Sequence, residues 1–568
     1  MTVDIARAPA PVADRASLVV LAGLVVFPFL SPLVAGPSVN IWQSFVTGAC
    51  LAGLLVLMPT APLQRKMWIW LAASAFFVVL SDVGRVTAIL WPTLGVFVGI
   101  GAAASIGAGA VSGQGPHARS VAVGLLVAGL LTAVLGLLQY YGWAEFLGYL
   151  TTSPSEGRAW GNLRQRNQFA TLINLALVVV LWLYASRRSR RTGWALSVAA
   201  VLLVAAVVAS VSRTGLLQLL LIASIAAVMA WRERRGSPGG SQSERFGLPA
   251  PWVLLGAIPL YAAFHWLLPY LASAGVAVSG TGMLHRLQPA VVTTDSRVVL
   301  WQNVLTLIAQ RPLTGWGWGE LSFAHFATLY SGPRFPVILD NAHNLPLHLA
   351  VELGIPVALL ICGGFLWMVG AAKPWRERDP LRLMAWGLLG VILLHSLLEY
   401  PLWYGPFQLV FGLCLGILWP ASSKRPEANG RKLAAFAAAA AWVALIGYAA
   451  WDYTRISQIY LPRDTRMPAY RDDTLAKLQG SWLFSRQVDF AEVTLTTVTP
   501  ANAAHMHELA GRVLHFSPEP RVITKLIESA ELLGRDAEAH ALAERFRVAF
   551  PAAFARWLDN RPDDAPEL

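Results

Sequence analysis

Residues 340–352, which read DNAHNLPLHLAVE, place a polar cluster around His343 immediately before a long apolar segment. Ionisable groups at a membrane boundary are energetically costly and are usually retained for chemistry or transport. The rest of the chain is also apolar, since 56% of its 568 residues are hydrophobic and only 13% are charged. A soluble protein carries about a quarter charged residues. The sequence therefore predicts an all-α polytopic membrane protein.

Apolar segments long enough to cross a bilayer recur along the first 454 residues. The hydrocarbon core of a membrane requires about 20 apolar residues per helix. We expect about 13 transmembrane helices, at residues 17–36, 40–59, 67–81, 86–110, 120–140, 168–185, 194–211, 214–231, 252–272, 345–371, 383–399, 404–420 and 433–451.

The distribution of lysine and arginine predicts how these helices are oriented. With the N-terminus in the cytoplasm, 21 of these residues fall in inner segments and 9 in the longer outer loops. Cytoplasmic loops are enriched in positive charge. We therefore expect a multi-pass protein with its N-terminus in the cytoplasm and its C-terminus outside. The net charge of +12 reflects this bias and indicates no nucleic-acid partner.

The chain divides into two expected domains. Residues 1–454 form a transmembrane catalytic domain with periplasmic loops at 141–167 and 273–343, the second containing an amphipathic helix at 298–309. Residues 234–244, RRGSPGGSQSE, are typical of a flexible linker. Residues 455–568 are polar with helical periodicity and predict a small helical periplasmic domain. This domain either holds an acceptor or partner, or caps the membrane domain.

His343 is the first candidate for chemistry. Pro346 suits the first turn of a helix, and Asn341 or Asn344 can cap it. The positive end of the helix dipole favours a neutral imidazole, which can act as a general base toward a hydroxyl. The structural alternative is that His343 only helps to cap the helix.

Arginines in the outer segments are candidates for binding an anion. Arg213 lies in VSRTG, Arg297 lies beside Asp295 in DSRVVLWQ, and Arg164 lies in GNLRQRNQ. The alternatives are a local ion pair between Arg297 and Asp295 and an interfacial snorkelling position for Arg164. Together they place guanidinium groups on the face that carries His343, and arginine suits bidentate phosphate binding.

Two further pairs carry polar groups near that face. Glu399 and Tyr400 end the span at 383–399, and Tyr400 can either bond a substrate oxygen or be an ordinary interfacial tyrosine. His348 and Glu352 lie one helical turn apart. Two residues alone provide too few ligands for a metal site. The three cysteines lie in apolar spans and form no CxxC motif. No metal or cofactor is expected.

These motifs resemble the O-antigen ligase and polymerase superfamily. Three motifs match that superfamily in residue type, in order along the chain and in the expected side of the membrane. They are the SR pair at 212–213, the R-x3-W pattern at 297–301 and the segment HNLPLHLAVELG at 343–354. GNLRQRNQFATLI at 161–173 and LLEYPLWYGPF at 397–407 are similar to elements of bacterial protein O-oligosaccharyltransferases of the PglL type.

The resemblance implies a metal-independent, inverting glycosyltransferase with a GT-C-type architecture. It also implies a place in the bacterial inner membrane, with the active site on the periplasmic side. Its donor would be an oligosaccharide on undecaprenyl diphosphate, and its acceptor a serine or threonine of a pilin-like or other periplasmic protein. The implied catalytic residues are His343, Arg213, Arg297 and Tyr400. The implied substrate-binding residues are Arg164, Gln165, Asn167, Asn344 and Glu399.

The chain departs from the family at two positions, where Arg166 replaces the usual proline and Gln168 the usual histidine. We expect the second position to tune the fit of the glycan. Three other functions stay open: an O-antigen ligase acting on lipid A core, a Wzy-type polymerase, and a lipid transporter. Transporters usually place charged sites near the bilayer midplane, where only His348 and Glu352 qualify here.

Overall fold

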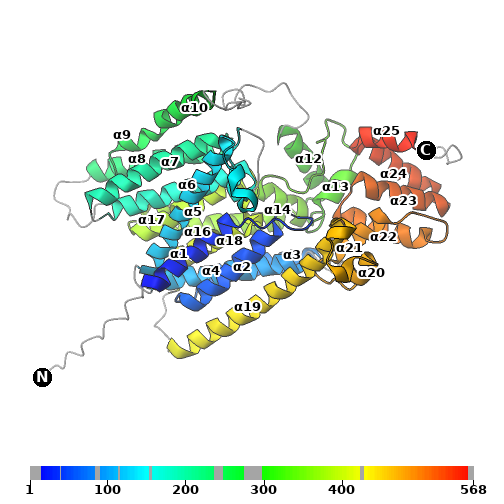
Figure 1. The fold of residues 1–568 in the computed structure, drawn as a ribbon, viewed down its shortest axis with the longest axis horizontal. Coiled ribbons are helices and arrows are strands. Elements are labelled where there is room, and N and C mark those ends of the chain that lie inside the picture. Colours follow the sequence, from blue (N-terminus) through cyan, green and yellow to red (C-terminus); the bar gives the residue numbers. More distant parts are fainter. Residues whose placement is uncertain are drawn as a thin grey trace.

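In the computed structural model, the described residues are 15–38, 40–82, 90–112, 116–151, 157–187, 189–235, 247–273, 297–421 and 428–560. Within these residues every regular element is a helix, apart from one isolated bridge between Leu63 and Pro420. Figure 1 shows a bundle of long helices with a group of shorter helices beyond one of its ends.

Eight helical segments among the described residues are long and apolar enough to cross a membrane. Four shorter apolar helices accompany them. The chain is therefore a polytopic membrane protein. The long segments are α4 (Leu90–Ser112), α5 (Pro116–Tyr140), α6 (Arg166–Ala185), α7 (Arg190–Ala209), α8 (Arg213–Arg235), α9 and α10 (Pro251–Leu255 and Ala257–Ser273), α15 to α16 (from Ile355) and α19 (Ala428–Ser457); the shorter ones are α1 (Arg15–Leu30), α2 (Ile41–Leu57), α17 (Pro380–Ser396) and α18 (Gly405–Leu418).

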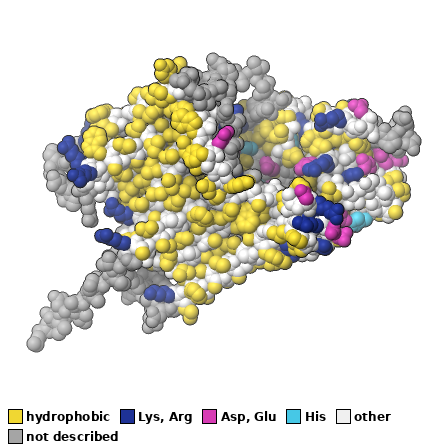
Figure 2. Space-filling model, in the orientation of Figure 1, with side chains coloured by type: hydrophobic (Ala, Val, Ile, Leu, Met, Phe, Trp, Pro, Cys, Tyr) yellow, Lys and Arg dark blue, Asp and Glu magenta, His cyan; other side chains and the backbone are white. Residues whose placement is uncertain are grey.

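Close helix contact holds the bundle together. Helix α18 packs along α4, where a Cβ atom on Gly416 would lie only 1.9 Å from the carbonyl oxygen of Ala104. Small residues permit such approach of backbones in membranes. Helix α6 is the most enclosed of the long helices, since 78% of its apolar segment is buried inside the protein. Apolar side chains cover the visible face of the bundle, and charged side chains gather at its ends and on the outer helices (Figure 2).

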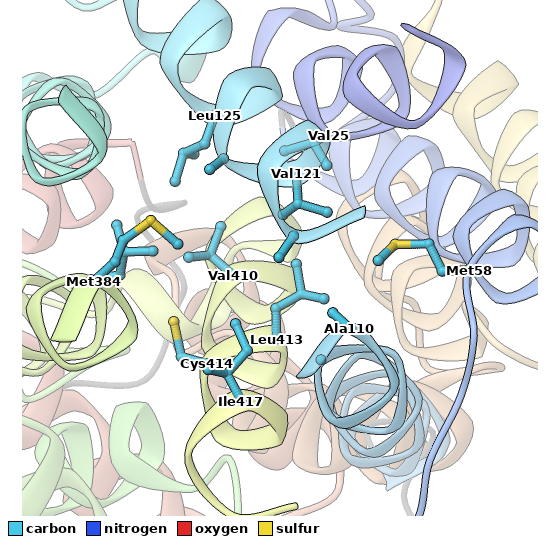
Figure 3. Close-up of a pocket in the computed structure, with 14 residues that line it drawn as sticks. Val25, Met58, Ala110, Val121, Leu125, Met384, Val410, Leu413, Cys414 and Ile417 are labelled. Carbon is cyan, nitrogen blue, oxygen red and sulfur yellow. The ribbon is translucent and has the colours of Figure 1, made fainter. Parts of the chain in front are cut away.

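An apolar pocket lies between α1, α4, α5, α17 and α18. Its lining includes Val25, Leu125, Met384, Leu413 and Cys414 (Figure 3). Apolar side chains provide all of its exposed lining, so it offers no group for acid–base chemistry.

The expected continuous helix at 345–371 is wrong, because the chain breaks at Gly354. Helix α14 (Leu345–Leu353) ends there, and Gly354 has a φ of +86°. Helix α15 (Ile355–Ala358), a π-helical turn (Leu359–Gly363) and α16 (Gly364–Ala372) follow. The N–H of Ile355 donates to the carbonyl of Pro312 at 2.8 Å, so an outer loop replaces the missing helical bond.

The outer part of the chain contains two groups of helices. The predicted helix at 298–309 is confirmed as α12 (Arg297–Gln310), and α13 (Leu321–Ala327) follows it. Beyond α19 lie α20 (Thr474–Leu478), α21 (Ser485–Leu495), α22 (Ala503–Phe516), α23 (Pro520–Leu532), α24 (Asp536–Ala549) and α25 (Pro551–Asp559). Figure 1 shows α13 beside this last group.

The remaining helix is α3 (Arg65–Ser81), and the short 3-10 helices are η1 (Glu145–Leu150), η2 (Gly161–Leu163), η5 (Pro374–Arg376), η6 (Pro401–Trp403), η7 (Gln458–Tyr460), η8 (Arg463–Thr465) and η9 (Pro468–Tyr470). The expected linker at 234–244 lies, from residue 236 onward, outside the described residues, as does Asp295.

Candidate active site

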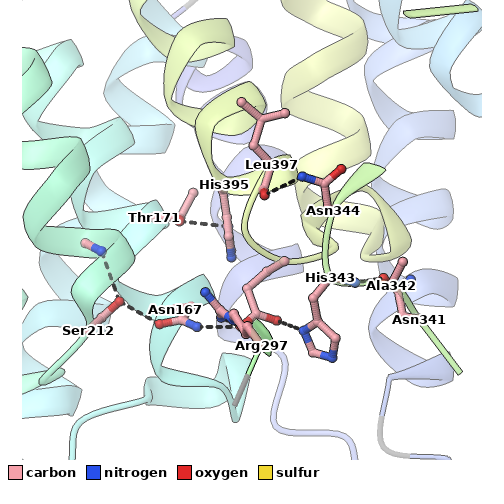
Figure 4. A network of polar contacts seen from close by, with 12 residues as sticks. Asn167, Thr171, Ser212, Arg297, Asn341, Ala342, His343, Asn344, His395 and Leu397 are labelled. Carbon is pink, nitrogen blue, oxygen red and sulfur yellow. Dashed lines mark hydrogen bonds and ion pairs between the residues drawn. The ribbon is translucent and has the colours of Figure 1, made fainter. Parts of the chain in front are cut away.

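Glu399 is the centre of a polar cluster that joins four distant parts of the chain. It follows α17, and its N–H donates to the carbonyl of His395 at 2.8 Å. Oxygen Oε1 accepts from Asn167 Nδ2 at 3.0 Å and from the guanidinium of Arg297. Oxygen Oε2 lies 2.6 Å from His343 Nδ1. The side chain is only 7% exposed, and both carboxylate oxygens have protein partners. Figure 4 shows Asn167, Arg297 and His343 gathered in this network.

The loop before α14 presents His343 while a neighbour caps the helix. Asn344 Oδ1 accepts from the N–H of Leu347 at 3.0 Å, and Asn344 Nδ2 donates to Leu397 O at 3.0 Å. His343 has a φ of +51°, and its N–H donates to Asn341 Oδ1 at 2.9 Å. The cap therefore belongs to Asn344, and the imidazole of His343 is turned toward Glu399 with 27% of its side chain exposed.

Tyr400 packs beside the imidazole. Its ring meets that of His343 edge-on at 5.1 Å and stacks on Tyr404 at 6.0 Å. Burial, together with the neighbouring Tyr404, raises the pKa of Tyr400, so its hydroxyl stays a neutral donor. Gln168 hydrogen-bonds with Tyr404 and is 1% exposed. The buried Gln168 therefore supports the stacked tyrosines, and its expected effect on the fit of the glycan stays a prediction.

The charges around Glu399 keep it ionised. Burial by itself raises the pKa of this carboxyl, but the hydrogen bond from His343 and the positive charge of Arg297 act in the opposite direction and lower it. The resulting pKa is lower than the ordinary value for glutamate. Opposite charges and hydrogen bonds to the ionised form have this effect.

Arg297 is the first residue of α12 and reaches Glu399 from the outer loop. Its side chain is 40% exposed, so one edge of the guanidinium binds the carboxylate while the rest faces solvent. The sequence suggested Asp295 as its partner, but Asp295 lies outside the described residues, and the structure supplies Glu399.

Asn167 connects this cluster to α8. Ser212 Oγ donates to Asn167 Oδ1 at 2.7 Å, and the N–H of Gly215 donates to Ser212 Oγ at 3.0 Å. Both Asn167 and Ser212 are buried. The two ends of the Asn167 amide are thus used by the protein, which suits positioning better than the substrate contact expected from the sequence.

A second polar layer lies deeper between the same helices. His395 Nδ1 lies 2.9 Å from Thr171 Oγ1, and Gln218 Nε2 donates to Thr171 Oγ1 and to Val391 O, each at 3.0 Å. Asn174 Nδ2 donates to Gln218 Oε1 at 3.0 Å. This layer fixes α6, α8 and α17 against one another. Sequence reasoning missed it, although His395 lies only four residues before Glu399, in the last turn of α17.

Three expected site residues have other surroundings. Arg213 begins α8 next to Ser212 and is exposed. Arg164 Nη2 donates to the carbonyls of Pro32 at 3.1 Å and Leu33 at 3.2 Å, which ties it to the segment after α1. Gln165 lies directly before α6, half-buried. The described residues contain no group of three or more His, Cys, Asp or Glu placed to hold a metal ion, and the metal-independent reaction stays a prediction.

Comparison with known proteins agrees with the motifs. Three family models match, described as "Protein glycosylation ligase" over residues 159–184, "O-Antigen ligase" over 198–362, and "Virulence factor membrane-bound polymerase, C-terminal" over 383–562. The first and second of these regions contain Asn167 and Arg297, respectively, and the third begins in α17 before Glu399.

Two curated relatives come from Acinetobacter baylyi. A general O-oligosaccharyltransferase is 24% identical over 334 residues, which is 56% of this chain and 53% of the relative. A ComP-specific O-oligosaccharyltransferase is 22% identical over 359 residues, which is 60% of this chain and 59% of the relative. The chain therefore spans just over half the length of each relative. The chain thus matches the O-antigen ligase model after a match to the protein glycosylation ligase model, which confirms the resemblance drawn from its motifs.

Proposed function

We propose that this protein transfers an oligosaccharide en bloc from undecaprenyl diphosphate to a serine or threonine hydroxyl of a periplasmic or pilin-like protein. One observation carries the proposal: the imidazole of His343 and the guanidinium of Arg297 share the carboxylate of Glu399, and both keep exposed surface. A base for a hydroxyl and a cation for a diphosphate therefore stand side by side.

The chemistry is a single displacement at the anomeric carbon of the first sugar. The acceptor oxygen forms the new glycosidic bond, the bond to the lipid diphosphate breaks, and the configuration inverts. His343 takes the hydroxyl proton. Arg297, aided by Arg213, neutralises the charge that develops on the departing diphosphate. Tyr400 orients the donor or the acceptor through its neutral hydroxyl.

The membrane arrangement in this proposal has thirteen spans. They are α1 to α8 singly, the α9–α10 pair, the α15–α16 segment, α17, α18 and α19, in a GT-C-type bundle with a cytoplasmic N-terminus. The charged cluster would then lie at the periplasmic face of the bacterial inner membrane, with residues 455–568 forming a periplasmic helical domain. Arginine-rich ends of α8 (Arg232, Arg234 and Arg235) would lie in the cytoplasm.

The acceptor distinguishes this function from its nearest alternative. Transfer to lipid A core is supported by the O-antigen ligase match over 198–362. Protein glycosylation is supported by the glycosylation ligase match and by the printed names of both relatives. The displacement is the same in both cases, so only the product separates them.

The test uses purified protein, a lipid-diphosphate oligosaccharide, and either a pilin-like protein or lipid A core. We expect glycosylated protein from the wild type and a loss of about 100-fold or more for His343→Ala. His265→Ala in α10 is the matched control, because His265 lies outside the cluster. The elution volume in size-exclusion chromatography and the midpoint of thermal unfolding should be unchanged in both variants. Wild-type turnover by His343→Ala would contradict the proposed base.

A further inference from the structure

We infer that a directed chain of hydrogen bonds, running from α8 through Ser212, Asn167 and Glu399, holds the proton of His343 on Nδ1 and keeps Nε2 as the accepting nitrogen. Its catalytic consequence rests on the function proposed above. Glu399, Asn167 and Ser212 then act as positioning residues, and no part of their role requires contact with the substrate.

The direction of the chain is set at its inner end. The N–H of Gly215 can only donate, so Ser212 Oγ accepts from it at 3.0 Å. The single hydroxyl proton of Ser212 is then directed to Asn167, whose nearer atom lies at 2.7 Å and must be the accepting Oδ1. A flipped amide would give the serine oxygen two donors and turn the amide oxygen toward a carboxylate. The amide of Asn167 therefore has one orientation.

The carboxylate passes this direction to the imidazole. Asn167 Nδ2 and Arg297 are both donors without accepting capacity, so Oε1 of Glu399 carries no proton. The pKa of this carboxyl is also below its ordinary value, so Oε2 carries no proton either. An ionised carboxylate can only accept, and Oε2 lies 2.6 Å from His343 Nδ1. The nitrogen Nδ1 therefore carries the proton, and the lone pair of the neutral ring is on Nε2.

The geometry thus selects one tautomer before the substrate arrives. A general base needs its free nitrogen fixed in both protonation and direction. Here a carboxylate that is 7% exposed supplies both, and the same carboxylate keeps the positive Arg297 beside the imidazole. The acceptor hydroxyl must approach from the Nε2 side.

Glu399→Gln tests the chain, because the replacement has nearly the same shape but a fixed polarity. Arg297 and Asn167 both donate to the Oε1 position, so the amide oxygen must remain there. The amide nitrogen then faces His343 Nδ1 and donates to it. The ring proton moves to Nε2, and the base loses its lone pair on the substrate side.

The measurement combines turnover with histidine nitrogen NMR. The protein has 11 histidines, and the His343 signals are identified by their absence in His343→Ala. We expect a protonated Nδ1 in the wild type at a pH where the ring is neutral, and a protonated Nε2 in Glu399→Gln. The kcat of Glu399→Gln should fall about 100-fold or more with little change in the donor KM. Glu399→Asp keeps a carboxylate, so it should keep the wild-type tautomer and part of the activity.

Each outcome decides something separate. A wild-type His343 protonated on Nε2 overturns the inference without any Glu399 variant, so a Glu399→Gln protein that fails to fold leaves the test intact. A folded Glu399→Gln with wild-type kcat also overturns it. If the wild type has the Nδ1 proton but glycosylates neither a pilin-like protein nor lipid A core, the proposed function fails while the directed chain stands.

Discussion

In the proposed function, Arg297 binds both the Glu399 carboxylate and the donor diphosphate. One of its terminal nitrogens binds Glu399, and 40% of the side chain is exposed, which leaves surface for a diphosphate. We predict that Arg297→Lys leaves the fold intact but lowers kcat or raises the donor KM by about tenfold or more, because an ammonium is a single point charge. Donor saturation curves measure this. Arg311→Lys, at the exposed end of the loop that follows α12, is the control, and equal curves for the two variants would contradict the role.

The partners of Glu399 explain how much of the site could be predicted. Each motif indicated the outer face, so the proximity of His343, Tyr400 and Arg297 could be expected. The sequence predicted that the carboxylate of Glu399 binds substrate and did not predict its protein partners. Those partners, His343, Arg297 and Asn167, lie 56, 102 and 232 residues away in the chain. No local periodicity reveals contacts over such separations. Only the packing of α6 against α17 brings Asn167 to Glu399.

At Gly354, the helix break packs against the loop that follows α12. A Cβ atom there would lie 2.2 Å from the carbonyl oxygen of Leu313, and the φ of +86° combined with a ψ of 158° is a conformation essentially confined to glycine. We predict that Gly354→Ala destabilises the protein by about 1–3 kcal/mol and lowers transfer. The loop would have to move, and Glu352 Oε2, which accepts from the N–H of Gly319 at 3.0 Å, would move with it.

Gly363→Ala provides the comparison for this prediction. Gly363 ends the π-helical turn of the same segment, and nothing lies within 4 Å of a Cβ atom placed there. Its thermal midpoint and transfer rate should equal those of the wild type. Equal thermal midpoints for the two glycine variants would show that the break carries no strain.

The same segment shows where sequence-based prediction of the helices failed. Hydropathy follows the apolar character of residues 345–371, which continues through the break. A hydropathy scale contains no information on backbone conformation, so it cannot show that Pro356 lacks an N–H or that Gly354 has a positive φ. Helix α12 was predicted correctly because its apolar and polar faces alternate with helical periodicity and no such residue interrupts it.

At the scale of the whole molecule, the C-terminal helices enclose part of the loop that carries the site. Phe326 of α13 is 2% exposed and packs in one apolar cluster with residues of α21 to α24. His515 Nδ1 lies 2.7 Å from Glu320 Oε2, and Arg545 donates to the carbonyl of Ala327 at 3.2 Å. These contacts favour the capping role over the acceptor-binding role that the sequence left open.

Removing the C-terminal helices distinguishes the two roles. Truncation after Ser457 would expose Phe326 and leave Glu320 without His515, so we predict faster amide exchange in residues 321–335 and a lower kcat. Ser322 Oγ donates to Leu339 O at 3.3 Å, which links α13 to the loop before His343. His540→Ala, an exposed change on α24 that leaves α13 covered, is the control for the outer helices. A truncated protein with normal kcat, unchanged exchange in the loop and a raised acceptor KM would reverse the conclusion, because it would mean that these helices hold the acceptor.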